Sequence, residues 1–230
     1  MLRMPNSTPL LGQAIDEIIA LAKINRFSVS WASEKDTEFI LSHPEVQGVS
    51  FTGSTASGEK VAVAAAKNLK RANLELGGSD PFIVLPDADI DLAVELAVGS
   101  RLAHCGQVCF SAKRFIVQEG IFYEFAEKLK ARVDLLKIGD PLDHETNIGP
   151  LSSVAIFERL RDQIRRGLEF EGPDGERAQL LFGGEVQEEF LIHHPTAIKV
   201  PGNQAPLNLN VSNSPEDIAL DLLAQIDSPE

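Results

Sequence analysis

The stretch QGVSFTGSTASGEKVAVAAAKNLKRANLELGG, residues 47–78, changes its pattern three times within one short unit. Its first residues, Gln47–Phe51, form a short apolar run that predicts a buried strand. The turn Thr52–Gly58 follows, and the alanine-rich run behind it is typical of a helix. Arg71–Leu76 returns to a strand pattern before a pair of glycines breaks it. A strand, a helix and a second strand in this order indicate a unit of a parallel sheet.

The same alternation of helices and strands continues on both sides of this unit. Upstream, the pattern predicts a helix over Leu10–Ile24, a strand over Arg26–Trp31 and a further helix with Ser33 as its N-cap. Downstream, strands are predicted over residues 81–85, 113–118 and 179–184, helices over 90–103, 121–137 and 154–168, and a long ordered loop over 137–151. After Gly184 no clear unit is predicted. The chain is therefore expected to be an α/β protein.

Composition and charge exclude several classes of partner. The chain has 230 residues, a formal net charge of −13 and 43% hydrophobic residues. A strongly acidic surface repels phosphate backbones and anionic lipids, so neither nucleic acid nor a membrane is expected as a partner. No apolar run approaches the roughly 20 residues that span a bilayer. Two cysteines and the lack of a signal-peptide pattern predict a reducing cytoplasm.

The segment HCGQVCFSAKRFIV, residues 104–117, places two cysteines four positions apart. On a helix, Cys105 and Cys109 would share one face, and with His104 they are conceivable metal ligands, but no second ligand pair supports this and no metal is expected. A disulfide between them requires strained geometry. Two buried sulfurs are the commonest fate of free cysteines. The fourth alternative is that one of them is a nucleophile.

The position of Cys109 favours the nucleophile over a buried sulfur. It lies in a glycine-containing turn between a helix and a strand, where reactive groups are often exposed. A thiolate there can attack a carbonyl carbon while N–H groups of the same turn hold the oxyanion. Glu75 is the candidate general base, because burial among Leu74, Leu76 and two glycines would raise its pKa. A structural hydrogen-bond acceptor remains the alternative for this carboxylate.

The turn FTGSTASG, residues 51–58, is a candidate phosphate site. It precedes a helix, whose N-terminus offers free N–H groups and a partial positive charge, and Ser54 and Thr55 add hydroxyl groups. It lacks the full dinucleotide-binding fingerprint and the lysine of a P-loop, so by itself the signal is weak.

Taken together, four motifs resemble the aldehyde dehydrogenase superfamily in their order and spacing. They are FTGSTASG, LELGGSDPFIVLPDADID, GQVCFSAKRFIV and GDPLDHETNIGPL, and the resemblance extends from about Leu10 to Gly184. The residue sequences GGSDPFIV and AKRFIV are most similar to those of the succinate-semialdehyde dehydrogenase branch. The resemblance implies the three-layer α/β architecture of that family, with a parallel sheet, in an incomplete form.

The resemblance also implies an activity. It is the NAD- or NADP-dependent oxidation of an aldehyde, such as succinate semialdehyde, to its carboxylic acid. Cys109 matches the family nucleophile and would form a thiohemiacetal and then a thioester. Glu75 matches the general base that activates the hydrolytic water. Cys105 and His104 stand where the family has other residues and inherit no role.

Six residues are implied as cofactor contacts. Three match the turn beside the pyrophosphate, two lie near the nicotinamide, and one stands where a family lysine contacts the adenosine ribose: Gly53, Ser54, Gly58; Leu76, Gly77; and Arg3. Because arginine is a fixed fork rather than a flexible point charge, the choice between NAD and NADP stays open.

Compared with the family, the chain is expected to be truncated at both ends. The expected organisation is a partial cofactor-binding domain over residues 1–76, a catalytic domain over 77–212 and a remnant helix over 213–230. A homo-oligomer is possible. The alternative to an enzyme is a catalytically inactive remnant that serves only as a binding or structural fragment.

Overall fold

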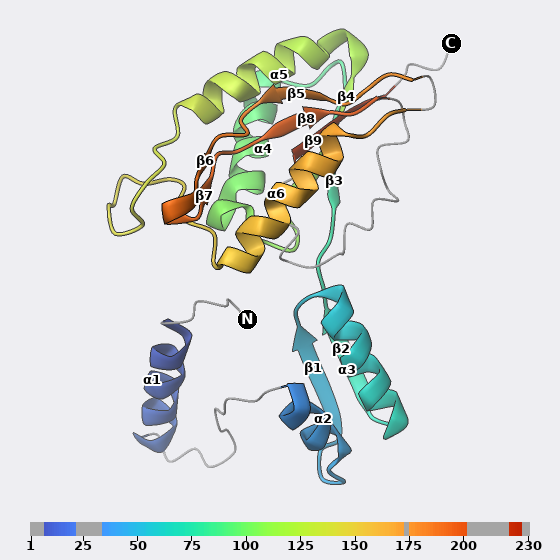
Figure 1. Ribbon diagram of the computed structural model, residues 1–230, viewed down its shortest axis with the longest axis vertical. Helices are drawn as coiled ribbons and strands as arrows, with labels where there is room; N and C mark the ends of the chain where they lie inside the picture. Colours follow the sequence, from blue (N-terminus) through green and yellow to red (C-terminus); the bar gives the residue numbers. More distant parts are fainter. Residues whose placement is uncertain (1–6, 22–33, 173–174, 202–220, 227–230) are drawn as a thin grey trace. The chain divides into compact units, whose positions relative to one another are not determined.

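The computed structural model describes residues 7–21, 34–172, 175–201 and 221–226. The chain forms two compact units, Met1–Glu75 and Leu76–Glu230, and each has helices and strands of its own (Figure 1). The strand expected over Arg26–Trp31, the cap at Ser33 and the contact residue Arg3 lie outside the described residues. In the ranges that are described, no helix is both long and apolar enough to cross a membrane.

The first unit contains the expected strand–helix–strand unit. Its elements are α1 (Ser7–Leu21), α2 (Glu34–Ser42), β1 (Gly48–Thr52), α3 (Thr55–Lys67) and β2 (Arg71–Glu75). The two strands pair in parallel, from Gly48 opposite Arg71 to Thr52 opposite Glu75. The expected burial of β1 is wrong, because the side chains of this two-stranded sheet are half-buried or exposed. A sheet of two strands with little covering it cannot bury both of its faces.

The second unit is built on a five-stranded sheet with the order β3-β4-β9-β8-β5. The strands are β3 (Asp80–Val84), β4 (Ala112–Gln118), β5 (Gln179–Phe182), β8 (Ala197–Lys199) and β9 (Asp221–Ile226). Neighbours from β3 to β8 pair in parallel, and β5 pairs antiparallel with β8 at one edge. The predicted parallel sheet is therefore confirmed for four of its five strands.

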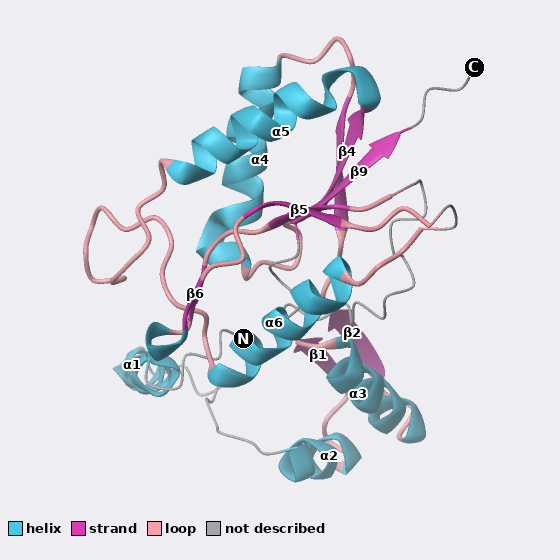
Figure 2. Cartoon of the chain, turned by 45° about the horizontal axis from the view of Figure 1, so that its top comes forward, coloured by secondary structure: helices cyan, strands magenta, loops and turns pink. Residues whose placement is uncertain are grey.

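Helices cover both faces of this sheet, which gives three layers (Figure 2). Helices α4 (Ile90–Leu102) and α5 (Glu119–Asp134) pack on one face, and α6 (Val154–Leu168) packs on the other. Successive residues of β8 show the two faces: Ala197 belongs to the cluster under α4 and α5, and Ile198 to the cluster under α6. Because side chains alternate along a strand, neighbouring residues serve opposite cores.

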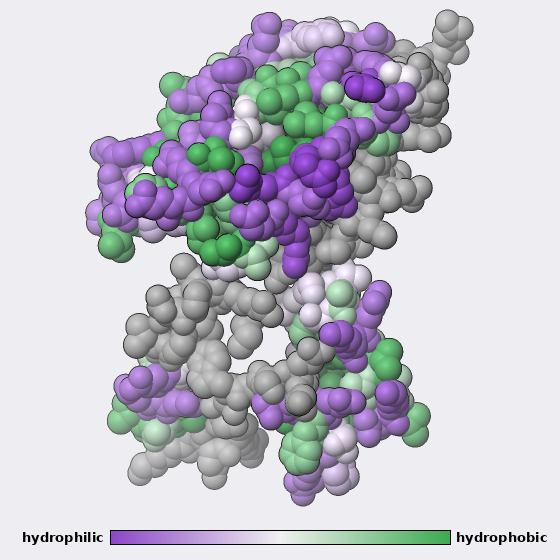
Figure 3. Space-filling view, in the orientation of Figure 1, coloured by the Kyte–Doolittle hydropathy of each residue, from purple (hydrophilic) through white to green (hydrophobic). Residues whose placement is uncertain are grey.

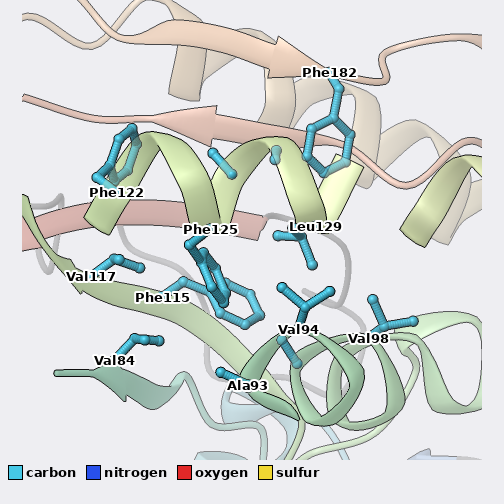
Figure 4. Packing of buried hydrophobic residues seen from close by; sticks show 14 residues of the cluster. Val84, Ala93, Val94, Val98, Phe115, Val117, Phe122, Phe125, Leu129 and Phe182 are labelled. Carbon is cyan, nitrogen blue, oxygen red and sulfur yellow. The ribbon is translucent and has the colours of Figure 1, made fainter. Parts of the chain in front are cut away.

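Phenylalanines fill the larger core, as Figure 4 shows. Phe115 of β4 and Phe122 and Phe125 of α5 are at most 1% exposed, and Val84 and Val94 pack in the same cluster. Burying side chains of this size contributes roughly 1.5–3 kcal/mol each. The apolar periodicity that predicted these helices therefore marks the face that is buried.

Two expectations for the C-terminal part need correction. A remnant helix was expected over 213–230, but Asp221–Ile226 is a strand that pairs in parallel with both β4 and β8. Since β4 is an interior strand, the backbone groups of its second edge need a partner, and this pairing overrides the local helical pattern. After Gly184 there are short elements that the sequence did not predict, namely β6 (Val186–Gln187), η2 (Glu188–Phe190), β7 (Ile192–His193) and β8.

Apolar side chains are also exposed among polar ones on both units (Figure 3). Phe39 of α2 is 70% exposed, Leu92 and Leu96 of α4 are each 56% exposed, and Phe190 of η2 is 58% exposed. Exposed apolar residues in such numbers favour association with further protein surface.

Candidate active site

The cysteine segment leaves helix α4 through a left-handed turn. The short 3-10 element η1 (Ala103–Gly106) follows α4, and φ is 51° at His104, 59° at Cys105 and 77° at Gly106. Three successive residues of this kind cannot continue a right-handed helix. The expectation that Cys105 and Cys109 could share a helical face is therefore wrong. Cys109 instead lies in the loop before β4, as the turn pattern predicted.

Two side chains fix the backbone of this loop. The buried Arg101 donates from Nη1 to the carbonyl oxygen of Gly106 over 3.2 Å. Gln107 donates from Nε2 to the carbonyl oxygen of His104 over 3.2 Å, and its Oε1 accepts from the N–H of Ser152 over 3.1 Å. These bonds hold the loop against both the end of α4 and the segment that follows the long loop 137–151.

The segment Leu76–Ser79, which follows the predicted general base, touches the predicted nucleophile. A Cβ added to Gly78 would lie 3.1 Å from the carbonyl oxygen of Cys109, so the two backbones are in close approach. Lys113 donates from Nζ to the carbonyl oxygen of Gly78 and lies 3.5 Å from that of Cys109. Arg114 donates from Nε to the carbonyl oxygen of Ser79 over 2.9 Å. Within the second unit, the glycine motif and the cysteine motif therefore form one assembly.

The two cysteines, both free, have different surroundings. Each is half-buried, and the thiol of Cys105 accepts a hydrogen bond from the N–H of Gly149 over 3.2 Å. Burial raises the pKa of the Cys105 thiol, and the bond from Gly149 lowers it by less. A raised pKa keeps this thiol protonated near neutral pH, where the thiolate is the reactive form. Cys105 is therefore the poorer nucleophile by its own environment, although both cysteines are partly open to solvent.

Glu75 is the last residue of β2 in the first unit. Its carbonyl oxygen accepts from the N–H of Gly53 over 3.0 Å, so the general-base motif and the glycine turn meet at the ends of β1 and β2. The expected burial of its side chain is wrong, because Glu75 is exposed. Leu74 is only half-buried in this open two-stranded sheet and cannot enclose the carboxylate. The structure places Glu75 in the first unit and Cys109 in the second.

The glycine turn forms the N-terminus of α3 as the sequence predicted. Ser54 is the N-cap: its Oγ accepts from the N–H of Ser57 over 3.2 Å, and it donates to the Ser57 hydroxyl over 2.9 Å. Gly58 is buried, and its N–H donates to the carbonyl oxygen of Ser54 over 2.8 Å. The hydroxyl of Ser54 is thus engaged inside the turn rather than directed only outward.

Two features of this turn fit a phosphate group. Among the described residues, Thr55 Oγ1 is buried without a hydrogen-bond partner, which leaves a polar atom to be satisfied at the helix N-terminus. A Cβ at Gly53 would lie 2.5 Å from the tip of the Phe51 ring, so a larger residue in the turn that leads into the helix would have to displace that ring. The first N–H groups of a helix have no acceptor within it, so an anion is favoured at this end.

The sequence interpretation missed three residues of the site: Gln107, Lys113 and Thr55. The Thr55 hydroxyl was noted in the glycine turn, but Thr55 was not named as a cofactor contact. The signal for Lys113 was present in the strand pattern: a charged residue stands between Ala112 and the apolar end of a strand that is otherwise mostly buried. Leu76 and Gly77 are half-buried in the irregular segment between β2 and β3. In the part of the chain that the structure describes, no three His, Cys, Asp or Glu side chains are grouped to hold a metal ion.

Comparisons with known proteins agree with the architecture. The model of the aldehyde dehydrogenase family matches residues 1–207. A betaine aldehyde dehydrogenase of Rhizobium leguminosarum bv. trifolii is 41% identical over 182 residues, which are 78% of this chain and 36% of that protein. The succinate semialdehyde dehydrogenase [NAD(P)+] Sad of Escherichia coli is 39% identical over 75% of this chain and 37% of its own length.

Solved structures give the same picture. The succinic semialdehyde dehydrogenase of Streptococcus pyogenes, in complex with NADP+, superposes with a TM-score of 0.84 at 33% identity, covering 96% of this chain and 47% of that one. The betaine aldehyde dehydrogenase of Staphylococcus aureus, in complex with NAD+, gives a TM-score of 0.73 at 27% identity over 86% and 38%. The chain thus spans about a third of the length of the curated relatives and up to about half of the length of the solved chains.

Proposed function

Because this chain belongs to the aldehyde dehydrogenase family, we propose that it takes part in the NAD(P)-dependent oxidation of an aldehyde to a carboxylic acid, with Cys109 as the nucleophile. One observation carries the proposal: a partly open thiol lies in a loop that side chains fix in place, and the glycine motif packs against its carbonyl group. A nucleophile held in a fixed position reacts faster because little orientational entropy is lost when it attacks.

The chemistry starts at the sulfur of Cys109. Its thiolate attacks the carbonyl carbon of the aldehyde, a carbon–sulfur bond forms, and the carbonyl oxygen becomes the oxyanion of a thiohemiacetal. N–H groups of the loop around Cys109 stabilise that charge. A nicotinamide cofactor, when bound, would supply the hydride acceptor that this chemistry needs. An acyl group then remains on Cys109 as a thioester.

Glu75 acts in the second half of the reaction. Its carboxylate takes a proton from water, the water oxygen bonds to the acyl carbon, and the carbon–sulfur bond breaks to release the acid and the Cys109 thiolate. Exposure of Glu75 in the first unit leaves its carboxylate accessible to water.

The N-terminus of α3 is the proposed site for the pyrophosphate of the cofactor. Gly53 carries no side chain into the turn, Ser54 orders it, Gly58 is buried in the first turns of the helix, and Thr55 offers an unsatisfied hydroxyl. Leu76 and Gly77 would lie near the nicotinamide, in the segment beside Cys109; Arg3 keeps its proposed role at the ribose. Either NAD or NADP is compatible with this turn, because the distinguishing ribose lies away from the pyrophosphate.

A semialdehyde is the proposed substrate class, with succinate semialdehyde first. Relatives named as succinate-semialdehyde dehydrogenases from three bacteria match this chain at 39–43% identity. We also propose the cytoplasm as the compartment, because a free thiol nucleophile needs a reducing environment.

The test is production of reduced cofactor by the purified chain. With succinate semialdehyde and either NAD or NADP, we expect absorbance of the reduced nicotinamide to rise. Cys109→Ala should abolish the rise, and the matched variant Cys105→Ala should keep it. If no semialdehyde gives reduced cofactor and both thiols are alkylated equally slowly, the chain is the inactive fragment instead.

A further inference from the structure

Lys113 is a buried lysine that the proposed reaction does not use. It is the second residue of β4 and is only 3% exposed. Its ammonium group donates to the carbonyl oxygen of Gly78 and lies 3.5 Å from the carbonyl oxygen of Cys109. A buried charge is costly unless acceptors satisfy it, so these carbonyl groups help to hold the ammonium where it is.

The two acceptors belong to segments that are 31 residues apart in the chain, Gly78 before β3 and Cys109 before β4. Their backbones already touch, because a Cβ at Gly78 would lie 3.1 Å from the Cys109 oxygen. The Lys113 ammonium contacts the carbonyl oxygens of both segments, and it reaches them from the strand that starts directly after the loop.

We propose that Lys113 is a positioning residue, whose ammonium fastens the nucleophile segment to the segment Leu76–Ser79 and keeps a positive charge beside Cys109. This rests on the proposed function of Cys109. A loop fastened in this way presents the Cys109 thiol in one orientation, and a nucleophile that is already oriented reacts faster. Lys113 itself makes no bond to substrate.

The test measures the rates at which iodoacetamide alkylates Cys109 and Cys105, by mass spectrometry of the two cysteines in the intact chain. Lys113→Met removes the charge and the contacts with the carbonyl oxygens of Gly78 and Cys109, with little change in volume. We expect the Cys109 rate to fall about tenfold, since loss of a charge-assisted hydrogen bond is of that order. The Cys105 rate should stay within about twofold, because Cys105 is bonded to Gly149 and not to Lys113.

Two further variants separate positioning from general stability. Lys113→Arg keeps the charge and should retain the Cys109 rate within about threefold. Lys128→Met removes a lysine of α5 that pairs with Asp91 and Glu124 at the surface, and it should leave both rates unchanged. If Lys113 only stabilises the fold, Lys113→Met should lower the unfolding temperature, and Lys113→Arg should not restore the alkylation rate of Cys109.

The outcomes distinguish the two proposals. If wild-type Cys109 reacts no faster than Cys105, the proposed function fails. If wild-type Cys109 is the faster thiol and Lys113→Met keeps its rate, the role of Lys113 is overturned while the proposed function stands.

A variant at Gly78 covers the case in which Lys113→Met does not fold. Gly78→Ala places a methyl group 3.1 Å from the Cys109 oxygen and disturbs the same contact from the opposite side. The Cys109 rate should then fall severalfold with Lys113 intact. An unchanged rate in Gly78→Ala would show that the contact does not position the nucleophile.

Discussion

The two units of this chain hold their functional segments by different means. In the first unit, the glycine turn depends on the N-cap of one helix and on a backbone bond between Gly53 and Glu75, over a two-stranded sheet with a largely exposed surface. In the second unit, the cysteine loop is fixed by buried or half-buried side chains over a three-layer core. The difference teaches that the nucleophile is placed by tertiary packing, whereas the cofactor turn is placed by local backbone geometry.

The largest effect should come from the core of the second unit. Phe125 is fully buried, so Phe125→Ala should lower the free energy of unfolding by about 3–5 kcal/mol. The matched variant Phe39→Ala removes a phenylalanine that is 70% exposed in the first unit, and it should change stability by less than about 0.5 kcal/mol. Urea unfolding followed by circular dichroism measures both. Equal effects would contradict the contrast between the units.

A smaller effect is expected at Arg101. Arg101→Met keeps most of the volume but loses the bond to the carbonyl oxygen of Gly106, so stability should fall by about 1–3 kcal/mol. Because this bond fixes the cysteine loop, alkylation of Cys109 should change as well. Hydrogen exchange at the amides of residues 104–111 would show whether the loop loosens; unchanged protection there would refute tertiary placement of the loop.

The N-cap of α3 tests how the first unit is held, and its removal should lower the free energy of unfolding by about 1 kcal/mol. Ser54→Ala removes the hydroxyl that accepts from Ser57, and faster hydrogen exchange is expected in the first turn of α3. Ser153→Ala removes the equivalent cap of α6, where Ser153 accepts from the N–H of Ile156. Since α6 is also held by its buried face, its exchange should accelerate less. The reverse order would show that the local cap does not dominate in the first unit.

The last effect depends on pH. Burial lowers the pKa of His193 in the second unit, and the bond to the carbonyl oxygen of His194 opposes this only partly. The unfolded chain therefore binds the proton more readily than the folded one, and stability falls as pH decreases below about 6.5, by at most about 1.4 kcal/mol per pH unit. His193→Gln should remove this dependence. Thermal unfolding between about pH 5 and 8, where histidine titrates, measures this dependence. If His193 is not responsible, the slope of stability against pH will be the same in His193→Gln as in the wild type.

Periodicity predicted the elements whose buried face is regular. α6 begins and ends at the expected residues, and β2, β3 and α4 lie within a residue or two of them. The strand β9 was mistaken for a helix because its pairing with β4 and β8 depends on distant segments, which a local pattern does not contain. The short elements after Gly184 were missed for the same reason.

The site shows the same division between local and distant information. Cys109 in its turn and Ser54 at its cap follow from neighbouring residues. The exposure of Glu75, the left-handed backbone at His104 and Cys105, and the contact of Lys113 with Gly78 depend on layers and segments far along the chain. A charged residue inside a strand pattern, such as Lys113, was the one local sign of that contact.

The most direct test of the account is to trap the acyl group on the chain. Glu75→Gln should form the thioester but hydrolyse it slowly, so incubation with succinate semialdehyde and oxidised cofactor, followed by peptide mass spectrometry, is expected to find the acyl group on the peptide at Cys109. An acyl group on Cys105, or none on either cysteine while the wild type reduces cofactor, would contradict the account.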